Sequence, residues 1–141
     1  MISTKGRYAL RVMIDLAQQD SDKYIPLNEI AARQEISLKY LEAIVKLFVK
    51  ANLLTGHRGK NGGYKLTRKP EEYPVGEILE IAEGTLSPVS CLSGNYNSCP
   101  RKESCSTLLM WTRFDNMVHD FFYGVSLKDI LNPADSIIKT Q

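Results

Sequence analysis

Long hydrophobic runs are absent from this 141-residue chain, although 43% of its residues are apolar. No run approaches the roughly 18 residues that a membrane-spanning helix needs. The N-terminal segment MISTKGRYALRVMIDLAQQD begins with basic residues, but Arg11 and Asp15 interrupt its apolar positions and no small-residue cleavage site follows. We therefore expect a cytoplasmic protein without a membrane partner, in which this segment is a helix of the mature domain.

Repeats, low-complexity segments and Gly/Ser linkers are also absent, and so are enzyme signatures. No nucleophile stands at motif spacing from a general base, and no metalloprotease or nucleotide-enzyme motif occurs. The length suits one compact domain with a dimerising extension. We expect a protein that is not an enzyme and that consists of one structural unit with an appendage.

Charge is divided unevenly along the chain, although the net charge is only +2. Residues 1–70 contain 13 Lys and Arg against 6 Asp and Glu, a balance of +7, whereas residues 71–141 contain 5 against 10, a balance of −5. A basic half attracts a polyanion, most simply nucleic acid, through counterion release. Ordinary surface charge that happens to be unevenly distributed is the alternative interpretation.

Helix signals dominate the first fifty residues. The spacing predicts a first helix over about residues 4–19, a short second helix over 27–34, and a third helix that begins after the N-cap Ser37. The third helix has a predicted core face of Leu38, Leu41, Ile44 or Val45, and Phe48, and a polar face of Lys39, Glu42, Lys46 and Lys50. Two short helices joined by a tight turn fit a helix-turn-helix whose second helix enters a DNA major groove. A purely structural pair of helices is the alternative.

A strand-turn-strand pattern follows the third helix. Residues 53–57 and 64–67 flank a glycine-rich loop that contains an Asn-Gly pair, a strong hairpin signal. A basic hairpin directly after a helix-turn-helix is a wing, with Arg58 and Lys60 at its tip, where they can reach phosphates or a minor groove. A phosphate-binding loop is disfavoured, because no Lys-Ser/Thr follows and the loop precedes a strand instead of a helix.

Four motifs occur together in this chain: STKGRYAL, IAARQEISLKYLEAIVKLFVKANLL, RGKNGGYKL and YPVGEILEIAEG. In their order and spacing the chain resembles, over nearly its whole length, the IscR-like, CymR-like and NsrR-like winged-helix regulators of bacteria. The resemblance implies a mainly α fold with a small β-hairpin wing, in which a winged helix-turn-helix DNA-binding domain precedes a long dimerisation helix. It also implies a homodimeric transcription factor, expected to be a repressor, on a palindromic operator in double-stranded DNA. The expected DNA contacts are Ser37, Lys39, Tyr40, Glu42, Arg58 and Gly59, to which the wing tip adds Lys60.

All three cysteines lie in the segment SCLSGNYNSCPRKESCS. In a reducing cytosol Cys91, Cys99 and Cys105 are not expected to form structural disulfides. Thiolates in a polar loop favour a soft metal centre, whether zinc, copper(I) or an iron–sulfur cluster, and two cations of the loop would offset its negative charge. Inert buried thiols are the alternative, although they suit an apolar helix better. The family resemblance implies an iron–sulfur cluster on these three cysteines, with [2Fe-2S] expected in preference to [4Fe-4S].

The fourth ligand of such a cluster stays open. Similar cluster regulators place a histidine three residues after the third cysteine, where this chain has Leu108. The nitric-oxide-sensing type uses an acidic residue near the N-terminus of the partner subunit, where this chain has Arg7. The remaining candidates are Glu103, Ser104, a side chain of the partner subunit's first helix and an exogenous ligand. We interpret His57 and His119 as surface or packing histidines.

A long amphipathic helix of about 18 residues, roughly 27 Å, is expected after the third cysteine. Its apolar stripe contains Leu108, Leu109, Met110, Trp111, Phe114, Met117, Val118, Phe121 and Phe122. Packing against a twofold mate would bury this stripe and set two recognition helices about one DNA turn apart, while part of it packs on the first helix of its own domain. Ser126 then starts a short closing helix. The chain is thus expected to divide into a DNA-binding domain (1–84), a cysteine-containing sensor loop (85–105), and dimerisation and closing helices (106–141).

Together these features predict a DNA-binding regulator in which cluster binding orders the cysteine loop, shifts the dimer helices and changes the fit of residues 37–40 to the operator. One alternative is a cluster-free regulator of sulfur or cysteine metabolism, which responds through a partner enzyme of cysteine biosynthesis or through thiol oxidation, because EGTLSPV resembles that branch of the family. A metal-dependent enzyme with an open coordination position is a second alternative. It is disfavoured because only Glu103 could act as a nearby acid or base.

Overall fold

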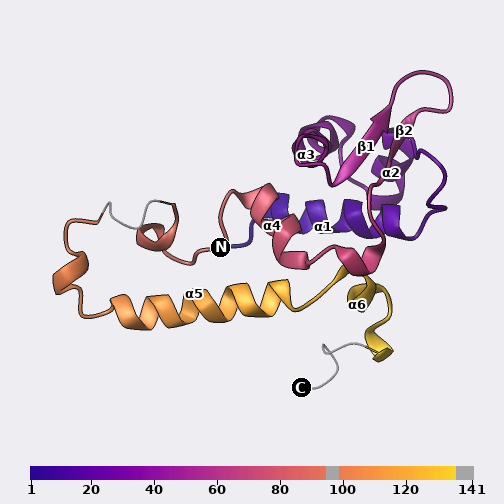
Figure 1. Cartoon of the computed structure of the whole chain (residues 1–141). Helices are drawn as coiled ribbons and strands as arrows, with labels where there is room; N and C mark the ends of the chain where they lie inside the picture. Colours follow the sequence, from indigo (N-terminus) through magenta and orange to yellow (C-terminus); the bar gives the residue numbers. More distant parts are fainter. Residues whose placement is uncertain (95–98, 136–141) are drawn as a thin grey trace.

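The structure, a computed structural model, describes residues 1–94 and 99–135 and is mainly helical (Figure 1). The α-helices are α1 (Thr4–Ala17), α2 (Leu27–Gln34), α3 (Leu38–Lys50), α4 (Val75–Glu83), α5 (Leu108–Tyr123) and α6 (Leu127–Leu131). The strands are β1 (Leu54–His57) and β2 (Gly63–Leu66), and 3₁₀ turns lie at Pro70–Glu72, Ser90–Leu92, Lys102–Ser104 and Pro133–Asp135. This arrangement confirms the predicted fold class, mainly α with a small antiparallel hairpin.

The predicted helix-turn-helix is present as α2 and α3. Glu35 ends α2 in the left-handed conformation (φ 54°), and the next residue, Ile36, is buried. Ser37 caps α3 as predicted, because its hydroxyl oxygen accepts a hydrogen bond from the Tyr40 backbone N–H at 3.2 Å. The predicted core face is confirmed at Leu41, Ile44, Val45 and Phe48. The prediction is wrong for Leu38, which is 43% exposed, because it lies at the very start of α3, where neighbouring helices no longer cover that face.

One apolar core joins α1, α2, α3, α4 and the hairpin. Its fully buried members include Val12, Met13, Ile30, Leu41, Ile44, Phe48, Leu53, Leu54, Tyr73 and Ile78. The buried hydroxyl of Tyr73 donates to the Leu53 carbonyl at 2.7 Å and accepts from the backbone N–H groups of Thr67 and Arg68 at 2.9 and 3.0 Å. These bonds satisfy the only polar atom of this large core side chain and tie both ends of the hairpin to the segment before α4.

The predicted wing is present as an antiparallel hairpin. Leu54 lies opposite Leu66 and His57 opposite Gly63, within one residue of the predicted strands. A bridge between Ile25 and Tyr64 attaches the segment before α2 to β2. Gly63 has φ 145°, and a Cβ there would collide with the Ile25 backbone, so this close approach requires glycine. The first residues of β2 are therefore anchored to the segment before α2, while the loop between the strands projects away from the helices (Figure 1).

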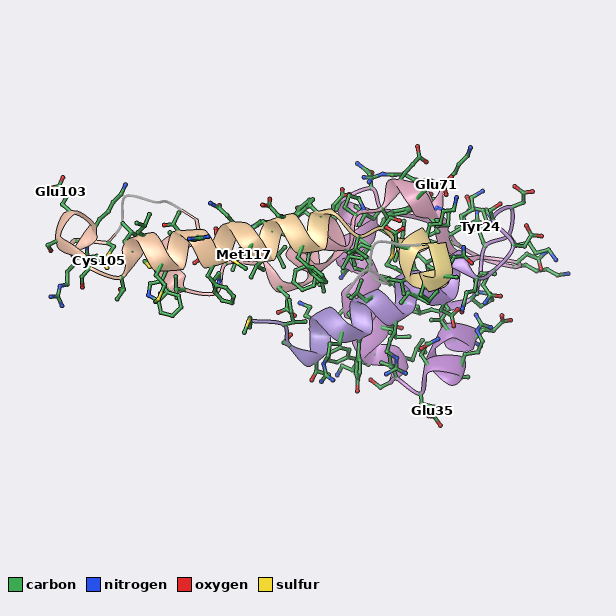
Figure 2. All side chains as sticks on the ribbon, turned by 90° about the horizontal axis from the view of Figure 1, so that it is seen from below. Tyr24, Glu35, Glu71, Glu103, Cys105 and Met117 are labelled. Atoms are coloured by element: carbon green, nitrogen blue, oxygen red, sulfur yellow. The ribbon has the colours of Figure 1, made fainter. Side chains whose placement is uncertain are left out.

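Helix α5 has 16 residues and begins at Leu108, slightly shorter than expected. It packs mainly against α4 instead of α1: Val118 and Phe122 are partly buried beside Val75 and Leu79. The expected partner was wrong because an apolar stripe indicates that a helix is covered but not which helix covers it, and α4 lies between α1 and α5 (Figure 1). Figures 1 and 2 both show α5 extending beyond the other helices, with the cysteine segment at its far end.

The closing helix α6 begins as predicted. The Ser126 hydroxyl accepts from the Asp129 backbone N–H at 3.1 Å, and the Asp129 carboxylate accepts from the Ser126 N–H at 2.8 Å, a complete capping box. No helix in residues 1–94 and 99–135 is long and apolar enough to cross a membrane. Residues 95–98 of the predicted sensor loop and residues 136–141 after the closing helix lie outside the described residues.

Candidate nucleic-acid interface and cysteine site

A groove of about 1130 Å³ lies between α3 and the wing. From α3 it is lined by Lys39, Glu42, Ala43, Lys46, Val49 and Lys50, and from the hairpin by Gly56, His57, Arg58, Gly59, Gly62, Gly63 and Tyr64. Pro26 and Leu27 at the start of α2 complete it. Four Lys or Arg residues against a single carboxylate make this groove basic, which is the electrostatic requirement for binding a phosphate backbone.

The groove brings together most of the residues expected to contact DNA. Lys39 and Glu42 enter it from α3, and Arg58 and Gly59 enter it from the wing. Lys60 is exposed in the same loop but does not line the groove. Helix and wing therefore present their polar side chains to one shared space, as two arms of a single interface would.

Two other residues of the expected interface have roles within the fold. Ser37 uses its hydroxyl oxygen to cap α3, and neither Ser37 nor Tyr40 lines the groove. Tyr40 is 38% exposed, and its ring meets the ring of Tyr8 edge to face, with centroids 5.6 Å apart. Both residues lie at the start of α3 beside the groove, so their contact with DNA stays a prediction.

The structure adds groove residues that the expected contacts omitted. Lys46 and Lys50 continue the row of Lys39 and Glu42 along α3 at spacings of three and four residues, so the helical period already contained this signal. His57 also lines the groove, and its ring lies 5.3 Å from that of Tyr24. Only the strand pairing reveals His57, because it places the last residue of β1 opposite Gly63, next to the wing loop.

Positive φ angles occur in the wing loop at Gly59 and Asn61 but not at Gly62. Asn61 adopts φ 62° and Gly59 φ 92°, and the Gly62 N–H donates to the Gly59 carbonyl at 3.0 Å. A Cβ at Gly59 would meet nothing within 4 Å, so its glycine is required by the backbone angle and not by crowding within the chain. The open space beside Gly59 leaves its backbone accessible to an external partner.

The three cysteines, which lie within fifteen consecutive residues (91–105), line one small cavity of about 20 Å³. Leu92, Lys102 and Leu108 complete its lining. Cys91, Cys99 and Cys105 are all half-buried free thiols. As placed in the part of the chain that the structure describes, no three His, Cys, Asp or Glu side chains are close enough together to hold a metal ion. The segment thus gathers the thiols around one point without forming a closed coordination site.

The surroundings of Cys105 favour its thiolate form. Its Sγ lies 3.4 Å from the Thr107 hydroxyl. This hydrogen bond lowers the pKa of Cys105, with backbone N–H groups of Thr107 and Leu108 and the charge of Arg101 acting in the same direction. A lowered pKa increases the fraction of thiolate, which is the form that binds metals and reacts with oxidants.

Neither Glu103 nor Ser104, the two candidate fourth ligands within the cysteine segment, lines the cysteine cavity. Both residues are exposed, and Figure 2 shows Glu103 at the outer end of the segment. Leu108 does line the cavity, at the position where similar regulators have histidine. His119 packs between α4 and α5 instead: its Nδ1 lies 2.9 Å from the Asp115 carbonyl and its Nε2 3.8 Å from the Glu80 carboxylate.

The face of α5 that does not pack on α4 is apolar and exposed. Its exposed members are Leu109, Met110, Phe114, Met117 and Phe121, with Leu109 at 81% and Met117 at 62% exposure. Isolated surface hydrophobics are ordinary, but several on one helix face form a contiguous patch. Such a patch is typical of a protein–protein interface.

Comparison with known proteins reveals similar chains. Residues 2–133 match the family described as Rrf2, iron-dependent transcriptional regulator. Protein rrf2 of Nitratidesulfovibrio vulgaris (strain Hildenborough) is 33% identical over 133 residues, which cover 94% of this chain and 88% of that protein. CymR (YrzC), the global cysteine regulator of B. subtilis, superposes with a TM-score of 0.75 at 32% identity, covering 96% of this chain and 98% of that one. IscR of T. potens superposes with a TM-score of 0.70 at 29% identity, covering 100% of this chain and 93% of that one.

Proposed function

The chain belongs to the Rrf2 family of DNA-binding transcriptional regulators, which are not enzymes, and we propose that it is a homodimeric repressor whose operator binding is modulated by an iron–sulfur cluster. The observation that carries this proposal is the presence of two separate sites in one chain. A basic groove lies between α3 and the wing, and a cavity lined by three thiols lies at the far end of α5.

The groove is proposed to hold double-stranded DNA. In this arrangement α3 enters the major groove, and Lys39 and Glu42 in its first two turns face base edges. Arg58 reaches phosphates or the minor groove from the wing, while Lys46 and Lys50 neutralise the backbone beside α3. Glu42 is the single carboxylate in this basic lining, which makes it a candidate for base readout, because a carboxylate near phosphates costs energy unless it accepts from a base such as cytosine.

The exposed apolar face of α5 is proposed to pack against the same face of a second copy. A 16-residue helix is about 24 Å long, so two such helices side by side would cover a large part of the patch. A twofold axis along this contact would present two α3 helices to successive turns of one face of DNA. This arrangement requires a palindromic operator.

The cysteine segment fits an iron–sulfur cluster in its chemistry. Cys91, Cys99 and Cys105 provide three soft donors, one of them with a lowered pKa, and Lys102 brings a positive charge to the same cavity. A cluster bound by these thiolates would change its charge with the redox state, and so would the fraction of the protein that holds a cluster. We propose [2Fe-2S] in preference to [4Fe-4S]. Because the thiols surround a cavity of about 20 Å³ without forming a closed site, binding must draw this segment into a new arrangement.

Ordering of the cysteine segment is proposed to reach α3 through the packed helices. Cys105 is three residues before α5, α5 packs on α4, and Glu83 of α4 accepts hydrogen bonds from Ser3 and Gly6 at the start of α1. Coupling between two sites in one protein is typically about 1 to 3 kcal/mol, which is enough to switch promoter occupancy.

Anaerobic purification tests the cluster directly. Iron, sulfide and zinc are measured together with the visible absorption spectrum, for the natural chain and for the triple variant Cys91→Ser, Cys99→Ser, Cys105→Ser. Ser106→Ala, which changes an exposed side chain next to the third cysteine, is the matched control. Iron and sulfide in equal amounts in the natural chain and in the control, but not in the triple variant, would support the proposal. Colour and iron that persist in the triple variant would refute it.

A cluster-free regulator is the second candidate function. It is favoured by the lowered pKa of Cys105 and by the likeness to CymR, the global cysteine regulator of B. subtilis. In this case the signal would be thiol oxidation or binding of a partner enzyme of cysteine biosynthesis. The metal-free protein would then change its DNA affinity after treatment with hydrogen peroxide, or with the purified partner enzyme, and the triple cysteine variant would lose only the response to peroxide.

A further inference from the structure

The motif STKGRYAL and the next turn of α1 place polar side chains against the helix-turn-helix. Tyr8, Arg11 and Asp15 lie three and four residues apart on α1 and contact α2 or α3. We propose that these three residues, the α1 seam, are positioning residues that set the placement of Tyr40 and the first turn of α3, and so determine operator specificity without touching DNA. The proposal rests on α3 being the recognition helix, as in the proposed function.

Asp15 fixes the last turn of α2. It is the one charged side chain among the buried residues of the described chain, with 2% exposure. Its carboxylate accepts from Arg33 Nε at 3.0 Å, from a terminal nitrogen of Arg33 at 2.8 Å and from Gln34 Nε2 at 2.9 Å. A buried carboxylate is costly unless donors such as these pair with it. Because Arg33 makes a bidentate contact with Asp15, the contact fixes the placement of α1 relative to α2.

Arg11 fixes the turn between α2 and α3. Its Nε donates to the Gln34 side-chain oxygen at 3.1 Å, and a terminal nitrogen donates to the Gln34 backbone carbonyl. Gln34 is the last residue of α2, and Glu35 after it takes the left-handed conformation that starts the turn. Carbonyls at a helix end have no partner within the helix, so Arg11 supplies one at the point where the chain changes direction.

Tyr8 carries this placement to the start of α3. The Arg11 guanidinium lies over the Tyr8 ring, 5.2 Å from its centroid. The Tyr8 ring in turn meets Tyr40 at a centroid distance of 5.6 Å and an interplanar angle of 77°. Tyr40 is the third residue of α3 and 38% exposed, so one part of its ring is held while the rest faces outward. Holding the ring in one rotamer before binding reduces the entropy lost when it contacts DNA.

The seam is expected to affect specificity and not general affinity. Tyr8, Arg11 and Asp15 do not line the basic groove, so no phosphate contact is lost when they change. Non-specific binding depends on the number of neutralised phosphates, whereas discrimination between sequences depends on where the side chains at the start of α3 stand. A loosened seam therefore lowers operator affinity while binding to unrelated DNA stays the same.

Fluorescence anisotropy on one anaerobic preparation of the full chain tests this inference. The probes are a duplex selected from a random library by the natural protein and a scrambled duplex, each titrated at several salt concentrations. The seam variants are Tyr8→Leu, which removes the ring, and Arg11→Lys, which keeps the charge but loses the forked contacts. The matched controls are Tyr8→Phe, which keeps the ring, and Arg7→Lys, the same change four residues earlier at an exposed position.

We expect both seam variants to lower the ratio of selected to scrambled affinity by about 3- to 30-fold, the range typical of residues that act at a distance. Scrambled-DNA affinity and the salt slope should stay at their natural values, and both controls should behave as the natural chain. An unchanged ratio, or an equal loss on both duplexes of the kind that partial unfolding causes, would overturn the inference. Arg58→Ala tests the proposed function separately. If this variant binds both duplexes with the affinity of the natural chain, the proposed DNA interface is wrong, whatever the seam variants do.

Discussion

The contact between α4 and the start of α1 predicts two different effects of Gly6→Ala on the free energy of unfolding. The substitution should lower it or leave it unchanged in the natural chain, and should raise it in a Glu83→Ala variant. Glu83 accepts hydrogen bonds from the Ser3 N–H at 2.8 Å, the Ser3 hydroxyl at 2.7 Å and the Gly6 N–H at 3.0 Å. Hydrogen bonds to a charged group contribute about 1.5 to 3 kcal/mol each. Because these bonds share one partly exposed carboxylate, we expect the group to contribute about 1 to 3 kcal/mol in total.

Gly6 is the perturbation that tests this contact. A Cβ at position 6 would collide with the Glu83 carboxylate oxygen, so in Gly6→Ala the carboxylate must withdraw and its hydrogen bonds are lost. Gly6 also lies inside a helix, where alanine is more favourable than glycine by about 1 kcal/mol. In the natural chain the loss should exceed or cancel this gain, giving a net destabilisation of about 0 to 2 kcal/mol.

In a Glu83→Ala background the collision and the hydrogen bonds are both absent, so Gly6→Ala should stabilise the protein by up to about 1 kcal/mol. Urea denaturation of the four proteins of this double-mutant cycle at pH 7 measures the difference. If Gly6→Ala changes the free energy of unfolding by the same amount in both backgrounds, the contact between Glu83 and α1 does not carry the energy assigned to it.

Three further predictions follow from the same structure. Burial raises the pKa of Glu83, but the hydrogen bonds from Ser3 and Gly6 together lower it by a larger amount. The folded-state pKa of Glu83 therefore lies below the ordinary value of 4.5. The stability that the ionised Glu83 carboxylate contributes is therefore complete above that ordinary value and is lost as the pH falls through the folded-state pKa. Glu83→Gln should flatten this part of the curve of unfolding free energy against pH. Tyr73→Phe removes the acceptor of the partly buried Thr67 and Arg68 N–H groups and one of two donors to the Leu53 carbonyl, and should cost about 1 to 3 kcal/mol in urea denaturation, with little change in DNA binding. Lys46→Met should reduce the slope of log affinity against log salt by about 1 per protomer on any DNA sequence, whereas Lys128→Met, on α6 outside the groove, should leave the slope unchanged.

Local signals in the sequence were sufficient to predict the DNA-binding fold. Ser37 predicted the start of α3 because a cap acts within three residues, and the Asn-Gly pair predicted the wing because a hairpin turn is equally local. The repeat of polar residues along α3 also indicated the face of the helix that lines the basic groove. These predictions succeeded because each depends on neighbours only a few residues away.

Contacts between distant residues could not be predicted in this way. Ser3 lies directly before α1, where a serine can cap the helix, but its hydroxyl donates instead to Glu83, which is 80 residues away. The partner of α5 was wrong for the same reason, since an apolar stripe does not identify the surface that covers it. The spacing of the cysteines indicated a soft-metal site, and the structure gathers them around one cavity, but a fourth ligand that comes from a second subunit or from solution leaves no signal in the cysteine spacing.

We propose that the cysteine segment controls how tightly the basic groove binds DNA. The most direct measurement compares the affinity for the selected duplex of anaerobically purified protein with that of the same preparation after chelation has removed its iron. We predict a difference of about 5- to 150-fold that disappears in the triple Cys91→Ser, Cys99→Ser, Cys105→Ser variant, while scrambled DNA shows none. Equal affinities before and after iron removal, or a difference that survives in the triple variant, would show that the cysteine segment does not control DNA binding.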